Sequence, residues 1–512
     1  MLSSKLVLKN SAIGIIGHMV SMIFGFVIQK CFLYYLGLEI LGINGVIADM
    51  LGFLSLAELG VGGAITYRLY KPLVEDDKEM ITSLMKLYSF LYNVIGVVVF
   101  VVGSILLLFL PFFVKDTVVD FTFIRFAYLI QLVTTTSTYF FAYKRSLLYV
   151  DQKQYVCKII DMCCNLLFCV IRIGVLILLK NYIVYLIMML LQSVLSNVIV
   201  SLYCDKYYPL LKNKNVKKFT EIKEIFKDTK EILMGKLAGY VYSTTDNLVI
   251  SGILGVTNVG SMSNYKIVTN SVKNLMSSMT DSIMATVGNF VHMKDKEAAF
   301  VMLKRYTFAR YVVVNVAATG LIVCTDTFVT LVYGEQYLMT GRIPVLIVID
   351  IFISMIYGPL GEFDSVLGYF SYEKWIHFAG AALNLGSSIL LAFWLGIEGV
   401  LIGTCLSQLF FWISKSILLC GKYFQSSLKW RILWGKYIAY VAVESLEVIM
   451  IRFICNAMFQ SQYTILSFGV QVMFCILIPI VLITLFFGRT DEYKYFLNIA
   501  KNFVQKNREK KG

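Results

Sequence analysis

Polar side chains recur at helical spacing within one largely apolar stretch of this chain, residues 261–290. The members of this stripe are Lys266, Asn270, Lys273, Asn274, Ser277 and Asp281. Residues three and four apart fall on one face of a helix. Lysine binds phosphate as a point charge, and amides and hydroxyls can hydrogen-bond sugar hydroxyls. The stripe therefore predicts a surface that binds an anion, and phosphate is the group that fits it best.

Two other apolar segments carry comparable polar faces. In 11–36 the face consists of His18, Ser21, Gly25 and Gln29, and in 232–254 it consists of Lys236, Gly239, Ser243 and Asn247. With isolated cations in other segments, they complete a set of candidates for a cationic, substrate-binding cavity. The full set is His18, Lys30, Arg125, Arg172, Lys236, Lys266, Asn270, Lys273 and Asn274.

Some of these charges have simpler interpretations. Lys30 and Arg125 lie near the ends of their segments, where long side chains can reach water at a membrane surface. Lys158 and Asp161 lie one turn apart, and we expect them to pair with each other.

Four acidic residues in apolar segments are candidates for coupling to H+ or Na+, namely Asp49, Glu58, Asp246 and Asp281. Glu58 has an alternative role as a structural partner of a buried lysine or backbone group. The sequence has no phosphate-binding loop of the form GxxxxGK[ST], and its eleven cysteines show no metal-ligand spacing. We therefore expect no catalytic residues, no metal and no bound cofactor. We expect the energy source to be an ion gradient, the membrane potential or substrate consumption.

The elements that carry these residues are membrane-spanning helices. Of the 512 residues, 58% are hydrophobic and 15% are charged, whereas soluble proteins carry about 25% charged residues. The apolar residues form long runs, and about 20 of them in a helix cross the hydrocarbon core. We predict fourteen spans, at 11–36, 38–69, 86–113, 121–143, 156–179, 182–203, 232–254, 261–290, 306–333, 342–367, 375–395, 397–421, 434–459 and 463–488. The chain is thus predicted to be an all-α polytopic membrane protein.

Basic residues are concentrated on one side of these spans, which orients them. With both termini in the cytoplasm, most loop lysines and arginines, including those of 206–231, lie inside, as the positive-inside rule requires. The formal charge of +14 then faces the lipid bilayer, and we expect no nucleic-acid partner.

The two halves of the chain align when shifted by 218 residues. Gly37 and Gly42 match Gly255 and Gly260, and "DKE" recurs at 77–79 and 295–297. Six spans separate the copies, so the repeats are parallel and related by an axis along the membrane normal, with the substrate between them. The predicted parts are an N-terminal lobe (1–205), a basic cytoplasmic linker (206–231), a C-terminal lobe (232–425), two extra helices (426–488) and a basic cytoplasmic tail (489–512).

Four stretches resemble the N-terminal third of Wzx-type oligosaccharide flippases. They are "KNSAIGIIG" (9–17), "FLYYLGLEILGINGV" (32–46), "LSLAELGVGGAI" (54–65) and "LYKPLVEDDKEMI" (69–81). These flippases are the polysaccharide transporter branch of the superfamily that includes MATE exporters and lipid II flippases. The resemblance is close over about eighty residues, and the span count, duplication and basic tail agree with it elsewhere.

The resemblance implies two six-helix lobes in a V around a central cationic cavity, and alternating access. It also implies a polyprenyl-pyrophosphate-linked oligosaccharide as cargo, flipped from the inner to the outer leaflet of the bacterial cytoplasmic membrane for O-antigen, capsule or exopolysaccharide assembly. The two extra helices, 426–488, can form a groove for the lipid tail in related flippases. A polysaccharide polymerase and a chain-length regulator are the expected partners.

Three alternatives stay open from the sequence. A lipid II flippase is disfavoured because its first helix is rich in arginine, whereas the comparable basic positions here are His18 and Lys30. A cation-coupled MATE-type exporter would need a cavity rich in acids and aromatics. A membrane-embedded glycan polymerase or ligase would need an extramembrane domain or a large loop, and the predicted outer loops are short.

Overall fold

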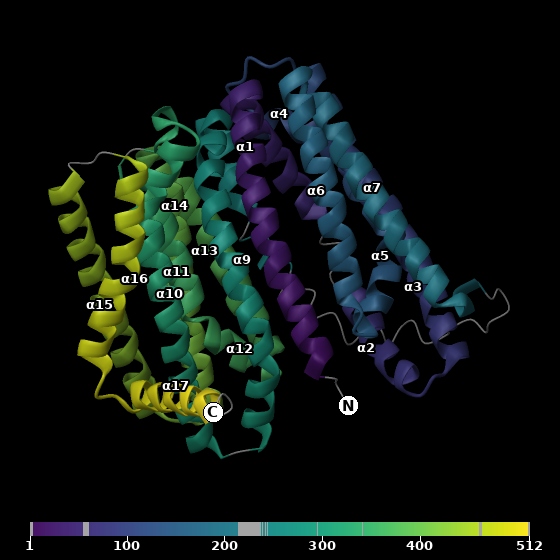
Figure 1. The fold of residues 1–512 in the computed structure, drawn as a ribbon. Coiled ribbons are helices and arrows are strands. Elements are labelled where there is room, and N and C mark those ends of the chain that lie inside the picture. The colour runs from purple at the N-terminus through teal and green to yellow at the C-terminus, as the bar shows by residue number, and fades with distance from the viewer. Residues whose placement is uncertain are drawn as a thin grey trace. The chain divides into compact units, whose positions relative to one another are not determined.

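Helices make up almost all of the part of the chain that the structure describes (Figure 1). The computed structural model describes residues 4–54, 61–212, 237, 239, 240, 242, 244–293, 295–339, 341–459 and 463–509. No strand occurs within these ranges, which confirms the predicted all-α class. The α-helices are α1 (Ser4–Leu54), α2 (Val61–Val74), α3 (Lys78–Leu106), α4 (Leu110–Phe113), α5 (Phe121–Val150), α6 (Gln154–Leu178), α7 (Tyr182–Tyr207), α9 (Val256–Met293), α10 (Lys296–Val332), α11 (Ile343–Ile356), α12 (Gly358–Val366), α13 (Phe370–Leu395), α14 (Ile397–Leu418), α15 (Ser427–Phe459), α16 (Ile465–Phe487) and α17 (Asp491–Glu509).

Within the described ranges, nine helical stretches are long and apolar enough to cross a membrane. One of them, Met19–Leu54, covers parts of the first and of the second predicted span. The predicted spans 121–143, 261–290 and 434–459 form helices α5, α9 and α15, but these helices are not among the nine. The chain is therefore a multi-span helical membrane protein, and the predicted count of fourteen stays a prediction.

The chain divides into two compact units. Unit 1 comprises Met1–Ile267, Asn274–Ser278 and His377–Val400, and unit 2 comprises Val268–Lys273, Met279–Ile376 and Leu401–Gly512. In unit 1, α5 packs on α3 and α7, and α6 packs on α1 and α7. In unit 2, α10 packs on α11, α15 and α16. The predicted lobe boundaries 1–205 and 232–425 stay a prediction.

Two matched glycines of the internal repeat break helices in the same way. Gly37 interrupts α1 at φ +85°, and Gly255 precedes α9 at φ +90°. A residue with a Cβ rarely adopts this backbone conformation, whereas glycine does so at no steric cost. The break at Gly37 separates the predicted spans 11–36 and 38–69.

The next matched pair, Gly42 and Gly260, makes a reciprocal contact inside unit 1. A Cβ on Gly42 would lie 2.0 Å from the carbonyl oxygen of Val256, and a Cβ on Gly260 would lie 2.3 Å from that of Leu38. Leu38 and Val256 are themselves 218 residues apart, so each repeat contributes the same surface. Glycine at both positions lets the two backbones approach closely, as at helix contacts in membranes.

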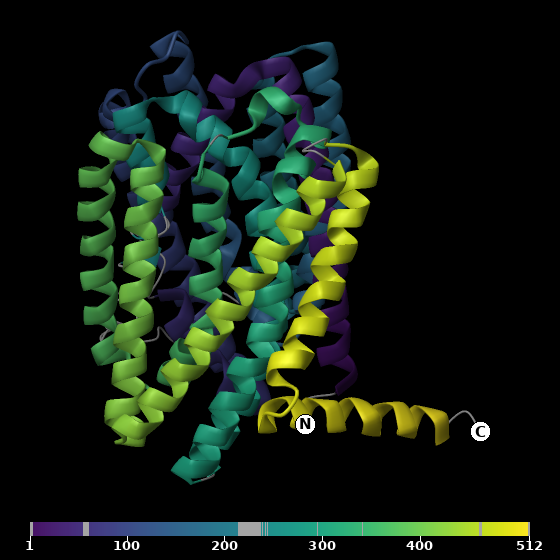
Figure 2. The ribbon, with the colours of Figure 1, turned by 90° about the vertical axis from the view of Figure 1, so that its left-hand side faces the viewer.

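The last helix of unit 2, α17, runs across the end of α16 (Figure 2). Its second residue, Glu492, is 4% exposed and lies 3.0 Å from Lys436 Nζ and 3.7 Å from Lys304 Nζ. Tyr493 and Phe496 pack around the ring of Phe308 on α10. The predicted tail 489–512 thus begins as a helix held by charge and by aromatic contacts.

We predict that acid releases α17 from this position. Burial of Glu492 acts to raise its pKa, but the hydrogen bond and charge of Lys436, with the charge of Lys304, outweigh burial and lower the pKa below the ordinary value of 4.5. A carboxyl group whose pKa is lower in the folded than in the unfolded state stabilises the folded state fully above about pH 4.5. This stabilisation is lost as the pH falls through the lowered pKa. The protection factors of the α17 amides, which are corrected for the intrinsic pH dependence of hydrogen exchange, should therefore fall below about pH 4.5 and stay constant from pH 5 to 8.

The matched control for this prediction is Glu492→Gln, which removes the titrating group. The variant should show lower protection of α17 at neutral pH and no further loss of protection on acidification. An acid response of the same size in this variant would contradict the assignment to Glu492.

Candidate functional site

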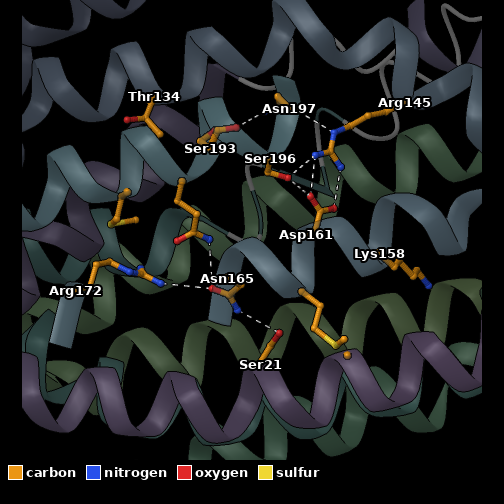
Figure 3. A pocket seen from close by; sticks show the side chains of 14 residues that line it. Ser21, Thr134, Arg145, Lys158, Asp161, Asn165, Arg172, Ser193, Ser196 and Asn197 are labelled. Atoms are coloured by element: carbon orange, nitrogen blue, oxygen red, sulfur yellow. Dashed lines mark hydrogen bonds and ion pairs between the residues drawn. The ribbon is translucent and has the colours of Figure 1, made fainter. Parts of the chain in front are cut away.

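A polar cavity of about 530 Å³ lies among four helices of unit 1 (Figure 3). Its walls carry cationic, amide and hydroxyl side chains from α1, α5, α6 and α7. The polar members are Ser21, Thr134, Arg145, Lys158, Asp161, Asn165, Arg172, Gln192, Ser193, Ser196 and Asn197. The volume lies within the range of about 300–1,000 Å³ that is usual for small-molecule sites.

Helical spacing explains why α6 and α7 supply most of these side chains. On α6 the residues Lys158, Asp161, Asn165 and Arg172 follow steps of three, four and seven, which place them on one face. The opposite side of α6 includes the exposed Leu167 and Val170. The helix is therefore amphipathic: its polar face lines the cavity, and its opposite face is apolar.

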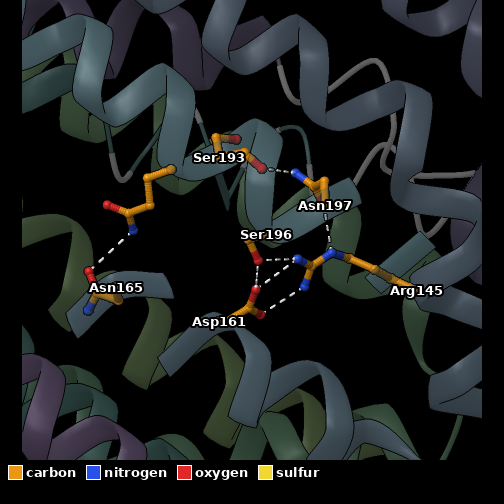
Figure 4. Close-up of polar contacts among 7 residues, drawn as sticks. Arg145, Asp161, Asn165, Ser193, Ser196 and Asn197 are labelled. Carbon is orange, nitrogen blue, oxygen red and sulfur yellow. Dashed lines mark hydrogen bonds and ion pairs between the residues drawn. The ribbon is translucent and has the colours of Figure 1, made fainter. Parts of the chain in front are cut away.

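Arg145 and Asp161 form a bidentate ion pair that crosses the cavity wall from α5 to α6 (Figure 4). Both Arg145 terminal nitrogens donate to Asp161 carboxylate oxygens at 2.8 Å, and Arg145 Nε donates to Asn197 Oδ1 at 2.8 Å. Ser196 from α7 donates to the same carboxylate at 2.5 Å. Because the pair is neutral and its donors are used, it fixes the three helices relative to one another.

Arg172 is the buried cation of the cavity, at 8% exposure. Its Nε donates to the Phe168 carbonyl at 3.3 Å, a terminal nitrogen donates to Asn165 Oδ1 at 3.4 Å, and the guanidinium lies 5.7 Å from the Tyr185 ring centre. None of these partners is anionic. The charge of Arg172 is therefore oriented but not neutralised by the contacts that hold it.

Lys158 adds a second uncompensated charge on the same wall (Figure 3). Lys158 forms no ion pair within the described part of the chain. Asp161, its expected partner, bonds to Arg145 instead. The cavity lining thus contains three cationic side chains and one anionic side chain. The resulting excess of two positive charges favours an anion, since charges in a low-dielectric wall are only weakly screened.

A smaller cavity of about 230 Å³ continues the polar surface toward Gly37 along α1. It shares Ser21, Asn165 and Arg172 with the larger cavity, and Gly25 and Gln29 of α1 also line it. Ser21, Gly25 and Gln29 belong to the polar face predicted for the segment 11–36. The His18 side chain, from the same face, lies outside the described residues.

The predicted stripe on α9 has a different environment. Lys266 donates to Asn247 Oδ1 at 2.7 Å, and Asn247 Nδ2 donates to Asp49 Oδ2 at 2.5 Å. A cavity candidate and an ion-coupling candidate are thus linked through one amide, and none of the three residues lines either cavity described above. The side chains of Asn270, Lys273 and Asn274 are exposed.

The other predicted residues are placed as follows. Arg172 lies in the wall of the cavity, whereas Lys30 and Arg125 are exposed and line neither cavity, which suits the interpretation that they reach water. Asp246 is half-buried. Glu58 and Lys236, with the side chain of Asp281, lie outside the described residues. The roles of all these residues in binding or coupling stay predictions.

The expectation about charge pairing on α6 was wrong. The expected pair between Lys158 and Asp161 is replaced by the Arg145–Asp161 pair, because a guanidinium can bind both carboxylate oxygens at once and a lysine cannot. Arg145 follows the predicted span 121–143, but α5 extends to Val150, so Arg145 belongs to this helix and lines the cavity. The signal that could have revealed the cavity was the spacing of polar residues on α6 and on residues 192–197 of α7.

No group of three or more His, Cys, Asp or Glu suited to a metal ion occurs within the described ranges. The donors that face the cavity are guanidinium, ammonium, amide and hydroxyl groups. These groups suit an anionic, hydroxyl-rich ligand.

Residues 7–285 match a protein family described as "Polysaccharide biosynthesis protein". The matched region is more than half of the 512 residues and contains every helix that lines the cavity. The chain belongs to this family. The match confirms the resemblance to Wzx-type flippases. No curated protein sequence matches the chain at a significant level.

Solved structures of transporters share the fold of this family member. The lipid II flippase MurJ in an inward closed conformation gives a TM-score of 0.62 at 15% identity, over 92% of this chain and 98% of that chain. An inward-facing multidrug resistance MATE transporter of the MOP superfamily gives 0.63 at 13%, over 79% and 96%. A MOP superfamily transporter from Pyrococcus furiosus, described by the reverse polarity of its binding pocket, gives 0.56 at 12%, over 81% and 96%. Identities this low show a common fold and not a common substrate.

Proposed function

We propose that this protein flips polyprenyl-pyrophosphate-linked oligosaccharide repeat units from the inner to the outer leaflet of the bacterial cytoplasmic membrane. Alternating access of the cavity to the two sides, with both termini in the cytoplasm, is part of the proposal. The observation that carries it is the polar cavity of unit 1, with its excess of two positive charges. Family membership and the transporter fold support the same function.

The pyrophosphate is the part of the substrate that most needs this cavity. Transferring an unpaired charge into hydrocarbon costs far more than a transporter can supply from contacts elsewhere. Arg172 can offer two parallel N–H donors to phosphate oxygens, and Lys158 can offer a mobile ammonium group. Asn165, Gln192 and Ser193 lie in the same walls and suit the hydroxyls of a sugar.

The lipid part of the substrate calls for a different surface. An apolar cavity of about 380 Å³ in unit 2 is lined by residues of α10, α16 and α17, among them Val312, Ile480 and Leu497. An isoprenoid chain is uncharged and gains free energy when its surface leaves water. We propose this cavity as a contact site for the polyprenyl chain; of its three helices, α16 belongs to the segment 426–488 that was predicted to form a groove for the lipid tail.

The energy source belongs to the same proposal. H+ or Na+ coupling would act on acids within the spans, of which Asp49 is tied to Lys266 through Asn247. A polymerase and a chain-length regulator would then receive the flipped units at the outer surface.

A multidrug exporter is the main alternative class, since MATE transporters share the fold. A cavity for cationic drugs needs acidic residues, whereas Asp161 is the single acid in the larger cavity and is bound to Arg145. Efflux of cationic dyes by the purified protein would favour this alternative.

Deletion of the gene in its native bacterium tests the proposal in cells. We expect loss of one surface polysaccharide and accumulation of its lipid-linked repeat units in the inner leaflet, measured by their protection from an external glycan-labelling reagent. Arrest of peptidoglycan synthesis instead would identify lipid II as the cargo. Normal surface glycan with normal unit orientation would contradict a flippase function.

A further inference from the structure

Two glutamates lie near the middle of α15, in unit 2, within the predicted span 434–459. Glu444 and Glu447 are one turn apart in a helix of 33 residues. At 1.5 Å per residue this helix is about 50 Å long, and the hydrocarbon core is about 30 Å thick. Both side chains are buried, at 6% and 0% exposure. Neither residue is among the candidates predicted from the sequence.

Both carboxyl groups converge on one amide of α10. Asn315 Nδ2 donates to Glu444 Oε2 at 2.5 Å and to Glu447 Oε2 at 2.7 Å. Thr319 Oγ1, one turn further along α10, donates to Glu444 Oε1 at 3.0 Å. The two carboxyl groups therefore lie within reach of a single donor, in a layer enclosed by α10 and α15.

No cation within the described part of the chain neutralises this pair. Of the four basic residues of α15, Lys429 bonds to Glu297, Lys436 to Glu492 and Arg452 to the Ile322 carbonyl, and Arg431 is exposed. The other titratable groups that face the pair are Tyr311 from α10, Tyr440 from α15 and Cys475 from α16, and none of them is cationic.

Two buried polar atoms in the cluster have no hydrogen-bond partner, Asn315 Oδ1 and Glu447 Oε1. Asn315 is 0% exposed, so bulk solvent does not reach its amide oxygen. A carboxylic acid O–H is a donor that such an acceptor can bind. A half-turn of the amide would direct its oxygen to that O–H, while its nitrogen would still serve the other carboxyl group.

The free energy of burial also favours a protonated carboxyl group in this pair. Burying an ionised carboxylate without a counter-ion costs several kcal/mol, and a second carboxylate within hydrogen-bond range adds repulsion. A proton removes both costs and needs no further space. A sodium ion would need several oxygen ligands in place of the N–H donor that Asn315 presents.

We propose that Glu444 and Glu447 form a proton-binding site at the centre of the membrane, with Asn315 bridging the two carboxyl groups. At neutral pH the pair holds at least one proton. The site itself rests on this cluster alone. Its use in driving transport would rest on the proposed flippase function, because a proton gradient can act only on a site that exchanges protons.

Infrared difference spectroscopy of the full chain in lipid membranes tests the site directly, because a protonated carboxyl group has a C=O stretching band that a carboxylate lacks. The wild type should show this band at pH 7 and lose it on deprotonation at high pH. The double variant Glu444→Gln/Glu447→Gln should lack the part of the band that disappears at high pH. The control Glu335→Gln, at an exposed acid outside this cluster, should retain it. An equal band in the wild type and the double variant would overturn the proposal.

The single variants keep the test decisive if the double variant does not fold. Each should shift the band, because the remaining acid changes its hydrogen-bond partner. An unchanged band in both single variants would overturn the proposal, as would its removal by NaCl but not by choline chloride, which would identify a sodium site. Because the measurement needs no transport, its failure would leave the flippase proposal standing.

Discussion

Replacing both Lys158 and Arg172 by glutamine is expected to weaken binding of a pyrophosphate-linked lipid by at least about 100-fold. A hydrogen bond to a charged group contributes about 1.5–3 kcal/mol, and about 1.4 kcal/mol corresponds to a tenfold change in affinity. Arg172→Gln alone should have the larger single effect, because Asn165 and the Phe168 carbonyl hold this guanidinium in place. Lys158 has no such support and must be ordered by the ligand.

Equilibrium binding to detergent-solubilised protein measures this effect, with the uncharged polyprenol as a ligand control. Lys206→Gln is the matched protein control, since it removes one positive charge from an exposed position at the end of α7. Binding to the wild type should weaken with salt, and the double variant should show a shallower salt dependence. Equal losses in the double variant and in Lys206→Gln would indicate a general charge effect instead of a cavity.

Gly42→Ala is expected to destabilise the protein by roughly 3 kcal/mol, at the upper end of the range for overpacked sites. The added methyl group would lie 2.0 Å from the Val256 carbonyl oxygen, and backbone on both sides leaves no flexible side chain to move aside. Gly260→Ala should act similarly, because its methyl group would lie 2.3 Å from the Leu38 carbonyl oxygen. Thermal denaturation of the purified protein should begin at clearly lower temperature in both variants.

Gly174→Ala is the control for this prediction. Gly174 also lies within a helix, α6, but a Cβ there would have no neighbour within 4 Å. Alanine is favoured over glycine in helices by about 1 kcal/mol, so stability should be unchanged or slightly higher. If Gly42→Ala matched Gly174→Ala in stability, the close approach of the two repeats would be contradicted.

Features that depend on local sequence were predictable. The helix break at Gly37 follows from a glycine between two apolar runs, and its match with Gly255 follows from the 218-residue shift. The polar face of Ser21, Gly25 and Gln29 follows from helical spacing, and all three residues line cavities.

Features that depend on which helices meet were not predictable from one sequence. A preference for pairing within a helix favoured Lys158 with Asp161, but α5 brings Arg145 to the same carboxylate with better geometry. The α9 stripe was the longest polar run, yet the larger cavity uses shorter runs on α6 and α7. Glu444 and Glu447 form a site only together with Asn315, which lies more than a hundred residues earlier in the chain.

Transbilayer movement in proteoliposomes tests the central claim most directly. A polyprenyl-pyrophosphate-linked oligosaccharide with a fluorescent glycan would be placed in one leaflet, and its movement followed with a membrane-impermeant quencher. We predict movement with the wild type and Lys206→Gln, and a rate near that of protein-free vesicles with Lys158→Gln/Arg172→Gln. Wild-type movement no faster than in protein-free vesicles, or equal rates for the wild type and the double variant, would contradict the account.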